Sequence, residues 1–559
     1  MCPDHSIVAG FLVGRPGATL GGVTAGAVTM SFSTGDSALL AGLLAAGLLL
    51  IAVSQLVRIP YPILLVLGGL GIGFVPGAPT VQLSPDLVLV AVLPPLLYGG
   101  AFFASLRELR ANVRPIGMLA IGLVLTTMVA VATVAHAVVP GLAWPQAFVL
   151  GALVSPTDPT AATAIAQRLG LPRRLIALIE GESLVNDGTA LVAYRFAVAA
   201  VVTGSFSLPR ATGDFALNVV GGIAVGLGVG YLIRQLRRRL DNPPVEITIA
   251  LLSGYFGYLP AQALGVSGVL AAVTVGIYMG WHTPELTTAQ TRLQGQAVWE
   301  IVFLLLNGLL FALVGLQLPS ILDALSGHST AEVIGYAALV SAVVLAARFL
   351  WIFSSAYVGR QVSRRFREED PAPSWAEKTI LAWSGMRGAV SLAAALALPI
   401  TTDAGTGFPD RNLVIFLTFG VILATLVVQG LTLPGLIRLL RLEDDGLAEK
   451  EEAKARIHAA QAALDRLAEL EAEDWVREDT AERMRGLYAF RQERFRSRFD
   501  PDGDGSVEDR SQAYQRLRRE LLDAERRAVQ DLRREGRIDD DVMRRVVRDL
   551  DLEDARLEL

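Results

Sequence analysis

The chain contains little cysteine, lysine and histidine, and residues 1–440 contain few charges of either sign. Cys2 is the only cysteine, which excludes an intrachain disulfide. No phosphate-binding loop of the G-x-x-x-x-G-K-[ST] type occurs, so ATP-driven pumping is not indicated. No filter-like TVGYG segment occurs, which disfavours a selective channel. The five histidines lie outside the motifs described below.

Apolar residues dominate the sequence. The 559 residues are 52% hydrophobic with a mean hydropathy of +0.47, which is unusual for a soluble globular protein. Uncharged apolar runs of about 20 residues recur, and each is long enough to span a bilayer as a helix. The sequence therefore predicts an all-α polytopic membrane protein in contact with the lipid bilayer. About thirteen transmembrane helices are expected, at residues 36–56, 60–77, 84–104, 113–138, 145–167, 176–203, 213–234, 245–261, 265–281, 296–318, 332–356, 376–399 and 411–436.

Charge is concentrated after residue 440. Of the 49 basic and 54 acidic residues, 25 and 33 lie in residues 441–559, which leaves 24 and 21 for residues 1–440. This change predicts a transmembrane domain over residues 36–440 and a charged, helical cytosolic domain over residues 441–559. Residues 1–35 are weakly apolar and rich in Gly, Ala and Thr. They are expected to be a leader, an extra partial span or an over-extended start that precedes an initiator at Met30.

The basic residues of the expected loops lie mainly on one side of the membrane. Seventeen Arg and Lys residues fall on that side, whereas only Arg210 and Arg411 fall on the other. The positive-inside rule makes the first side cytoplasmic. The amino terminus is therefore expected outside and the carboxyl terminus in the cytoplasm, with the protein in the cell (inner) membrane.

Few ionisable residues lie inside the expected spans, and charges at this depth mark functional sites by default. The segment GALVSPTDPTAATAI, residues 151–165, holds one of them between two prolines. Pro156 and Pro159 each remove an amide donor, so the helix is expected to unwind or kink at Thr157 and Asp158. The freed carbonyls, the Thr157 hydroxyl and the Asp158 carboxylate can replace part of an alkali cation's hydration shell. The alternative is a proline-bounded turn with Asp158 as a helix N-cap. The ionisable residues are Asp158, Glu180, Glu182, Asp187, Arg195, Glu300, Arg348 and Arg387.

A second polar segment, EGESLVNDGTALV, begins at residue 180. Glu182, Ser183, Asn186 and Asp187 are spaced so that they share one face of a helix, about one turn tall. This face offers two carboxylates, a hydroxyl and an amide. The alternative is a polar helix entrance solvated by the cytoplasm, which fits Glu180 better than Asp187 because Asp187 lies deeper.

The third segment, AWSGMRGAVSLAAALALP, spans residues 382–399. Gly385 and Gly388 flank Arg387, and glycine pairs loosen a helix. A buried arginine needs a carboxylate partner, which the span at 176–203 can offer. The alternative is an arginine that snorkels to the membrane interface.

The interrupted segments at 151–165 and 382–399 occupy matching places in the chain. With the seventh span as a linker, spans one to six and eight to thirteen form two inverted six-helix repeats. The broken helices, spans 5 and 12, are then each the fifth of their repeat. This arrangement is typical of the binding site of a secondary transporter near the bilayer midplane.

Together, SPTDPTAAT, EGESLVNDGTALV and SGMRGAVSLA closely resemble three signatures of the monovalent cation/proton antiporters. The most similar branch contains the electroneutral sodium/proton exchangers and their bacterial relatives. Residues 297–319 and 532–557 also resemble bacterial members, so the resemblance covers most of residues 36–559. It implies a mobile core domain and a dimerisation domain, hence a homodimer. It also implies a secondary transporter rather than an enzyme, with no cofactor and no nucleic-acid partner.

The resemblance further implies roles for individual residues. Asp187 would bind the cation and the proton in turn. Asp158 and Thr157 would line the same site, and Ser183 would contribute an oxygen. Asn186 stands where the electrogenic branch has a second aspartate, so electroneutral one-for-one exchange is implied.

Two further features concern the carboxylates. The resemblance pairs Glu182 with Arg387 as a structural ion pair. Many relatives carry an acidic residue near the end of the third span, where this chain has Tyr98, Gly99 and Gly100 instead. A role for a third carboxylate is therefore not indicated.

Competition at one carboxylate explains how such a site exchanges ions. Burial favours the protonated acid, whereas bound Na⁺ favours the carboxylate, so the two ions exclude one another at Asp187. Alternating access then carries the loaded site across the membrane, with low pH inhibiting transport. Li⁺ or K⁺ are further candidate cargoes. The alternatives are a K⁺/H⁺ antiporter, a cation channel with a regulatory cytosolic tail, and a membrane-anchored sensor.

The tail contains one candidate divalent-ion segment, DPDGDGSVEDRS, at residues 500–511. Asp500, Asp502, Asp504 and Gly505 match an EF-hand loop, but the twelfth position is Ser511 rather than glutamate. The segment is either a weak divalent site or an Asp/Gly-rich connector between helices. The tail is expected to regulate transport or assist dimerisation, through a ligand that the sequence does not identify.

Overall fold

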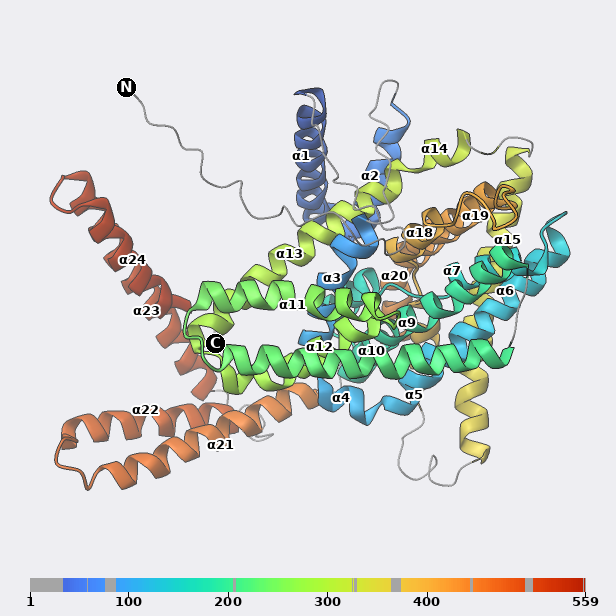
Figure 1. The fold of residues 1–559 in the computed structure, drawn as a ribbon. Coiled ribbons are helices and arrows are strands. Elements are labelled where there is room, and N and C mark those ends of the chain that lie inside the picture. Colours follow the sequence, from blue (N-terminus) through green and yellow to red (C-terminus); the bar gives the residue numbers. More distant parts are fainter. Residues whose placement is uncertain are drawn as a thin grey trace, which may run out of the picture.

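The regular structure of the chain is helical. The computed structural model describes residues 34–57, 59–75, 87–204, 208–323, 325, 329–362, 373–442, 446–497, 506–555 and 557. Within these ranges, the only pairing of β type is an isolated bridge between Thr401 and Gly407. The prediction of an all-α protein is therefore confirmed for the described residues, and Figure 1 shows a body of packed helices with further helices projecting from it.

The body is formed by the helices that precede residue 441. In chain order, with η marking π-helical segments, they are α1 (Thr34–Val57), α2 (Tyr61–Gly73), η1 (Leu87–Val92), α3 (Leu93–Phe103), α4 (Leu106–Ala111), α5 (Val113–Gly117), η2 (Met118–Leu123), α6 (Val124–Val138), α7 (Trp144–Val154), α8 (Thr160–Arg168), α9 (Arg173–Thr203), α10 (Leu208–Arg237), α11 (Pro243–Ala263), α12 (Gly268–Leu286), α13 (Ala289–Leu316), α14 (Leu318–Asp323), α15 (Thr330–Val362), α17 (Trp375–Trp383), α18 (Ala389–Leu396), α19 (Arg411–Ala424), η3 (Thr425–Gln429) and α20 (Gly430–Leu440).

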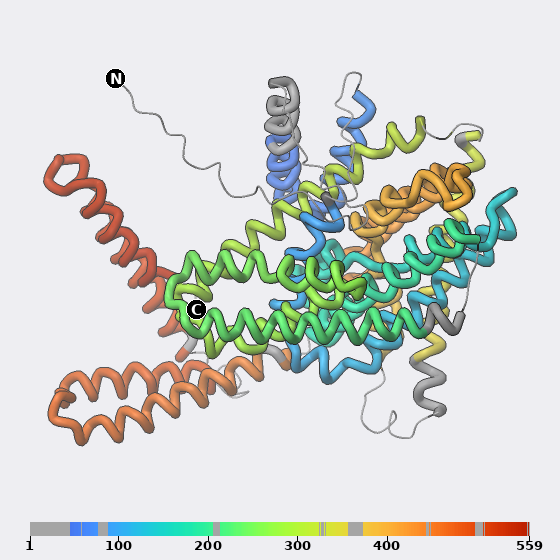
Figure 2. Tube along the Cα trace, viewed as in Figure 1, coloured from blue at the N-terminus to red at the C-terminus, as the bar shows by residue number. Residues whose placement is uncertain are grey.

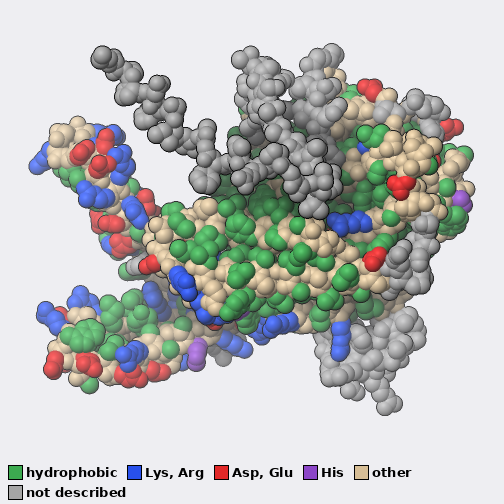
Figure 3. Space-filling view, in the orientation of Figure 1, with side chains coloured by type: hydrophobic (Ala, Val, Ile, Leu, Met, Phe, Trp, Pro, Cys, Tyr) green, Lys and Arg blue, Asp and Glu red, His purple; other side chains and the backbone are tan. Residues whose placement is uncertain are grey.

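The body has the composition of a membrane domain. Much of the face drawn in Figure 3 is covered by hydrophobic side chains, whereas charged side chains gather on the projecting helices. Four shorter apolar helices lie at Ala45–Val57, Tyr61–Gly73, Val88–Phe103 and Trp144–Val154. Six helical stretches among the described residues are long and apolar enough to cross a membrane, at Val113–Val138, Arg173–Thr203, Gly213–Arg237, Ala289–Asp323, Ala331–Ser355 and Arg411–Leu440.

Small residues let some helices approach closely. At the contact of α2 with α13, a Cβ atom on Gly69 would lie 2.3 Å from the Ala312 carbonyl oxygen. A Cβ atom on Gly315 would lie 2.2 Å from the Val66 carbonyl oxygen. Only glycine fits at these positions, which is the usual way in which membrane helices pack backbone against backbone.

Helical order is interrupted at both motifs that carry proline or glycine pairs. Helix α7 ends at Val154 and α8 begins at Thr160, so residues 155–159 are not helical. Helix α17 ends at Trp383 and α18 begins at Ala389, so residues 384–388 are not helical either. The two interruptions touch, because a backbone hydrogen bond joins residues 158 and 386 across them. Long helix α9 lies beside this crossing, since it packs on α7 and α8.

The charged tail forms two helical hairpins that project from the body (Figure 2). Its helices are α21 (Leu447–Leu470), α22 (Glu478–Ser497), α23 (Ser506–Arg534) and α24 (Asp540–Ala555). Ion pairs join α23 to α24, and one of them joins Arg518 to Glu553. The same two side chains are hydrogen-bonded, which raises the pKa of Arg518. Glu451 of α21 contacts the body through Arg107, at 2.7 Å. The candidate divalent ligands Asp500, Asp502 and Asp504 lie outside the described residues.

Candidate functional site

A cavity of about 450 Å³ lies where the interrupted segments meet α9. Apolar side chains of α3 and α13 form part of its wall. Three carboxylates line it, and no Lys, Arg or His is among its described lining residues. Such a wall favours a cation over an anion. The polar side chains that line it are Tyr61, Thr157, Asp158, Thr160, Thr163, Gln167, Glu180, Ser183, Asp187, Asn307 and Ser391.

Asp187 is a cavity carboxylate whose side chain has no partner among the described residues. It lies on α9, is 9% exposed and lines the cavity. Among the described residues, none hydrogen-bonds to its side chain or forms an ion pair with it within 4 Å, and Asp158 lines the same cavity. A buried carboxylate without a partner is costly, so it takes up either a proton or a cation.

Asp158 is held in place by both interrupted segments. Its backbone amide donates to the Met386 carbonyl oxygen at 2.8 Å. Its Oδ1 accepts a hydrogen bond from the Thr160 amide at 2.9 Å, at the beginning of α8. A Cβ atom on Gly388 would lie 1.9 Å from Asp158 Oδ2, so only glycine leaves room for this carboxylate. Asp158 therefore satisfies a helix amide and faces the cavity at the same time.

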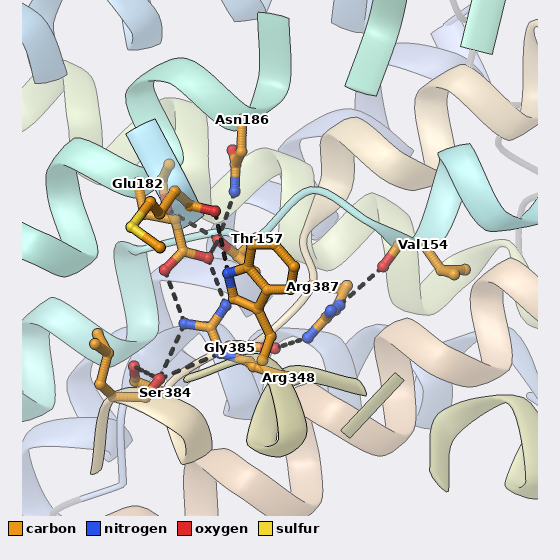
Figure 4. Close-up of polar contacts among 12 residues, drawn as sticks. Val154, Thr157, Glu182, Asn186, Arg348, Ser384, Gly385 and Arg387 are labelled. Atoms are coloured by element: carbon orange, nitrogen blue, oxygen red, sulfur yellow. Dashed lines mark hydrogen bonds and ion pairs between the residues drawn. The ribbon is translucent and has the colours of Figure 1, made fainter. Parts of the chain in front are cut away.

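Thr157 joins the first interrupted segment to α9. Its Oγ1 accepts a hydrogen bond from Asn186 Nδ2 at 2.8 Å and donates to Glu182 Oε1 at 3.2 Å. The Ser183 hydroxyl lies 3.3 Å from Thr157 Oγ1. Figure 4 shows Asn186, Thr157 and Glu182 converging. The structure thus brings together the predicted residues Thr157, Ser183, Asn186 and Glu182, and the Thr157 hydrogen is directed to Glu182.

The ion pair expected between Glu182 and Arg387 is not formed, and Arg348 takes the place of Arg387. Arg348, on α15, donates from Nη1 and Nη2 to the two carboxylate oxygens of Glu182, and the Nη2–Oε2 distance is 2.8 Å. Arg348 also donates from Nε and Nη2 to the Leu381 carbonyl oxygen, at 3.2 and 2.9 Å. Both charged side chains are at most 2% exposed. The guanidinium fork matches a carboxylate bidentately, so Glu182 is neutralised from α15.

Arg387 bonds instead to backbone oxygens. Its Nε donates to the Val154 carbonyl oxygen at 2.9 Å, and its Nη1 donates to the Gly385 carbonyl oxygen (Figure 4). The side chain is 1% exposed, so it does not snorkel to an interface. Its main-chain amide donates to Thr425 Oγ1 at 3.2 Å. Arg387 therefore satisfies carbonyl groups that the end of α7 and the second interruption leave unpaired.

Sequence reasoning left several of these features undetected. Arg348 was recognisable as a charge inside an apolar helix, but nothing in the sequence indicated its partner. Tyr61 and Asn307 line the cavity from α2 and α13, and Gln167 lines it from α8. A polar residue in an otherwise apolar span is the signal that marks Asn307.

The polar part of the cavity wall consists of oxygen-bearing side chains. Carboxylate, hydroxyl and amide oxygens face the cavity. Within the described ranges, no group of three or more His, Cys, Asp or Glu residues is placed to hold a metal ion. Hard oxygen ligands suit hard cations, a class that includes the alkali ions.

The chain belongs to the sodium/hydrogen exchanger family. Residues 40–439 match the family described as "Sodium/hydrogen exchanger, transmembrane". The protein is therefore a multi-pass membrane protein of a family of cation/proton antiporters, which are transporters rather than enzymes.

Named relatives agree with this assignment. The chain is 38% identical over 506 residues to an uncharacterised Na⁺/H⁺ exchanger of Mycobacterium tuberculosis, covering 89% of this chain and 92% of the relative. It is 36% identical to the Na⁺/H⁺ antiporter ApNhaP of Aphanothece halophytica, over 69% and 71% of the two chains. It is 34% identical to a sodium, potassium, lithium and rubidium/H⁺ antiporter of Bacillus subtilis, over 69% and 60%.

A solved structure shares the fold. The sodium proton antiporter MjNhaP1 from Methanocaldococcus jannaschii superposes with a TM-score of 0.57 at 22% identity. The superposition covers 72% of this chain and 99% of the archaeal one.

Proposed function

We propose that the protein exchanges Na⁺ for H⁺ across the membrane and that both ions compete for Asp187. The observation that carries this proposal is the state of the Asp187 side chain, which is buried, lines the cavity and has no partner among the described residues. A proton and a cation each neutralise this carboxylate, and neither leaves room for the other. Alternating access of the loaded site then makes the competition an exchange, which acid inhibits.

The charges around Asp187 favour electroneutral exchange. Arg348 cancels the charge of Glu182, and Asn186 is neutral. The other lining carboxylates are Glu180, about two turns away on α9, and Asp158, whose Oδ1 is occupied by an amide hydrogen bond. If Asp187 alone binds Na⁺ and H⁺ in turn, the expected exchange is one Na⁺ for one H⁺.

The identity of the cargo has one competing candidate. The Bacillus subtilis relative is named for potassium, lithium and rubidium as well as sodium. A cavity walled by mixed carboxylate, hydroxyl and amide oxygens also accepts a larger alkali ion. K⁺/H⁺ exchange by the same residues is therefore the second candidate, and Li⁺ is a further cargo.

We also propose the topology that such a mechanism requires. It has thirteen spans in two inverted repeats, and the broken helices at α7–α8 and α17–α18 lie at matching positions. The basic loops are cytoplasmic, which places the amino terminus outside and residues 441–559 in the cytoplasm. Residues 36–440 form the antiporter domain, and two copies form a homodimer.

The test is cation-dependent proton flux in proteoliposomes that hold the full-length protein. Na⁺, Li⁺ and K⁺ are compared, with and without a clamped membrane potential. Asp187→Asn keeps the shape of the side chain but cannot exchange a proton, so we expect flux to fall to background while the protein remains folded. Asp214→Asn is the matched control, because Asp214 is exposed on α10 and does not line the cavity.

Three outcomes decide between the functions. Saturable Na⁺-dependent flux that does not depend on the clamped membrane potential supports electroneutral exchange. Flux that is driven by the potential alone and does not saturate would favour a channel. Retained cation-dependent proton flux in Asp187→Asn would overturn the assignment of Asp187.

A further inference from the structure

A third carboxylate, Glu180, lines the same cavity as Asp158 and Asp187. It lies on α9 between Asp187 and the helix end that carries Arg173 and Arg174. We propose that Glu180 is a cation-capture residue, which concentrates the cargo cation at the mouth of the cavity and raises its rate of entry to Asp187. This proposal rests on the proposed function.

The spacing on α9 places Glu180 on the path to Asp187. Glu180, Ser183 and Asp187 are three and four residues apart, so they share one helix face, and all three line the cavity. Seven residues of helix separate the two carboxylates by about 10 Å along the axis. This distance is too long for one ion to bind both carboxylates, since oxygen ligands lie about 2–3 Å from a hard cation. Glu180 therefore acts before binding rather than as a ligand of the transported ion.

Helix α8 supplies a second polar face to the same cavity. Thr160, Thr163 and Gln167 follow one another at helical spacing, and all three line the cavity. Elsewhere its wall is largely apolar, with leucines of α3 and Phe303 of α13 among the lining residues. A partly dehydrated cation thus has polar groups on two helices along one route. Among the described lining residues, Glu180 is the charged one nearest the basic end of α9.

The contrast with Glu182 shows that the two glutamates serve different purposes. Glu182 is two residues further along α9, is not among the described lining residues of the cavity and is neutralised by Arg348. Glu180 is half-buried and has no ion pair or hydrogen bond with any residue that the structure describes. Because no basic side chain lines the described cavity wall, the charge of Glu180 is uncompensated there. A cleft with one sign of charge raises the local concentration of the opposite ion.

The test measures exchange at each membrane face with Glu180→Gln in full-length protein in proteoliposomes, with Na⁺ as the probe ion. A unit charge raises the concentration of a cation about 4 Å away roughly fivefold at the dielectric constant of water. We therefore expect the KM for Na⁺ to rise by roughly this factor at the face reached by the basic end of α9. The kcat should not change at either face. The KM for Na⁺ at the other face should not change either. Added N-methylglucamine chloride should reduce the difference, because salt screens a solvated charge.

Two variants control for structural effects. Glu180→Asp keeps the charge and should retain the wild-type KM. Glu285→Gln removes one negative charge from an exposed residue of α12 that does not line the cavity, and should leave the KM unchanged.

Two results would overturn the proposal. An unchanged KM in Glu180→Gln shows that the residue does not attract the cation. A loss of kcat equal to that of Asp187→Asn shows that Glu180 belongs to the transport site itself.

Failure of the proposed function gives a different pattern, in which the wild-type protein shows no Na⁺-dependent proton flux. In that case, the thermal unfolding midpoint is measured at increasing Na⁺ concentrations, which tests separately whether Glu180 attracts the cation. Equal midpoint shifts in wild type and Glu180→Gln at every Na⁺ concentration would then overturn the capture role.

Discussion

Removal of the Arg348 side chain should damage the protein more than any other single change near the site. Arg348→Met keeps an unbranched apolar side chain but deletes two hydrogen bonds to Glu182 and two to the Leu381 carbonyl oxygen. Glu182 is then left 1% exposed with one neutral donor, the Thr157 hydroxyl. In the Arg348→Met variant, the buried carboxylate of Glu182 therefore has no compensating positive charge.

The size of this effect follows from burial. Breaking a buried ion pair by removing one partner costs about 3–5 kcal/mol, because the remaining charge has lost its solvation and its counter-ion. Replacing both partners with apolar residues of similar size is often neutral or stabilising. Arg348→Met combined with Glu182→Met should therefore recover most of the stability that Arg348→Met loses.

The assay is a double-mutant cycle on the free energy of unfolding, measured by denaturing-detergent titration of the purified protein in micelles. The coupling energy between Glu182 and Arg348 should be at the upper end of the usual range of about 0.5–3 kcal/mol for residues in contact. A second cycle between Glu182 and Arg387 is the matched comparison, since both arginines are buried to the same degree. Stronger coupling of Glu182 to Arg387 than to Arg348 would refute the pairing described here.

Two further predictions concern the interrupted segments and the charge of the site. Gly388→Ala places a Cβ atom where Asp158 Oδ2 lies, so we expect exchange in proteoliposomes to fall at least about tenfold, the effect of roughly 1.4 kcal/mol on the barrier. Gly117→Ala is the control, because nothing lies within 4 Å of its added atom, and it should exchange normally. Asn186→Asp adds a second carboxylate beside Asp187, so flux should begin to depend on a clamped membrane potential.

Each of these predictions has an outcome that contradicts it. Full activity in Gly388→Ala would mean that Asp158 need not occupy its present position during transport. If flux in a folded Asn186→Asp variant still does not depend on the membrane potential, the neutral amide of Asn186 does not determine the stoichiometry.

The sequence alone was sufficient to predict the class of the protein. Apolar runs of about 20 residues leave no alternative to membrane-spanning helices, because an unpaired backbone amide is too costly in lipid. The three polar motifs were visible because charge is rare in such runs. Local rules also indicated where regular structure stops: Pro156 and Pro159 lie where α7 gives way to α8, and Gly385 and Gly388 lie between α17 and α18.

Only the tertiary structure decided which charges meet. Residues 182, 348 and 387 are all charged and deeply placed, and either arginine satisfies the general need of a buried carboxylate for a partner. Their pairing depends on how α15 and the second interruption lie against α9, over separations of more than 160 residues. The structure assigns Arg348 to Glu182 and Arg387 to backbone carbonyl oxygens, and it leaves Asp187 and Glu180 facing the cavity. Spacing along one helix specifies a shared face, but the packing of other helices determines which side chains on that face stay unpaired and available to an ion.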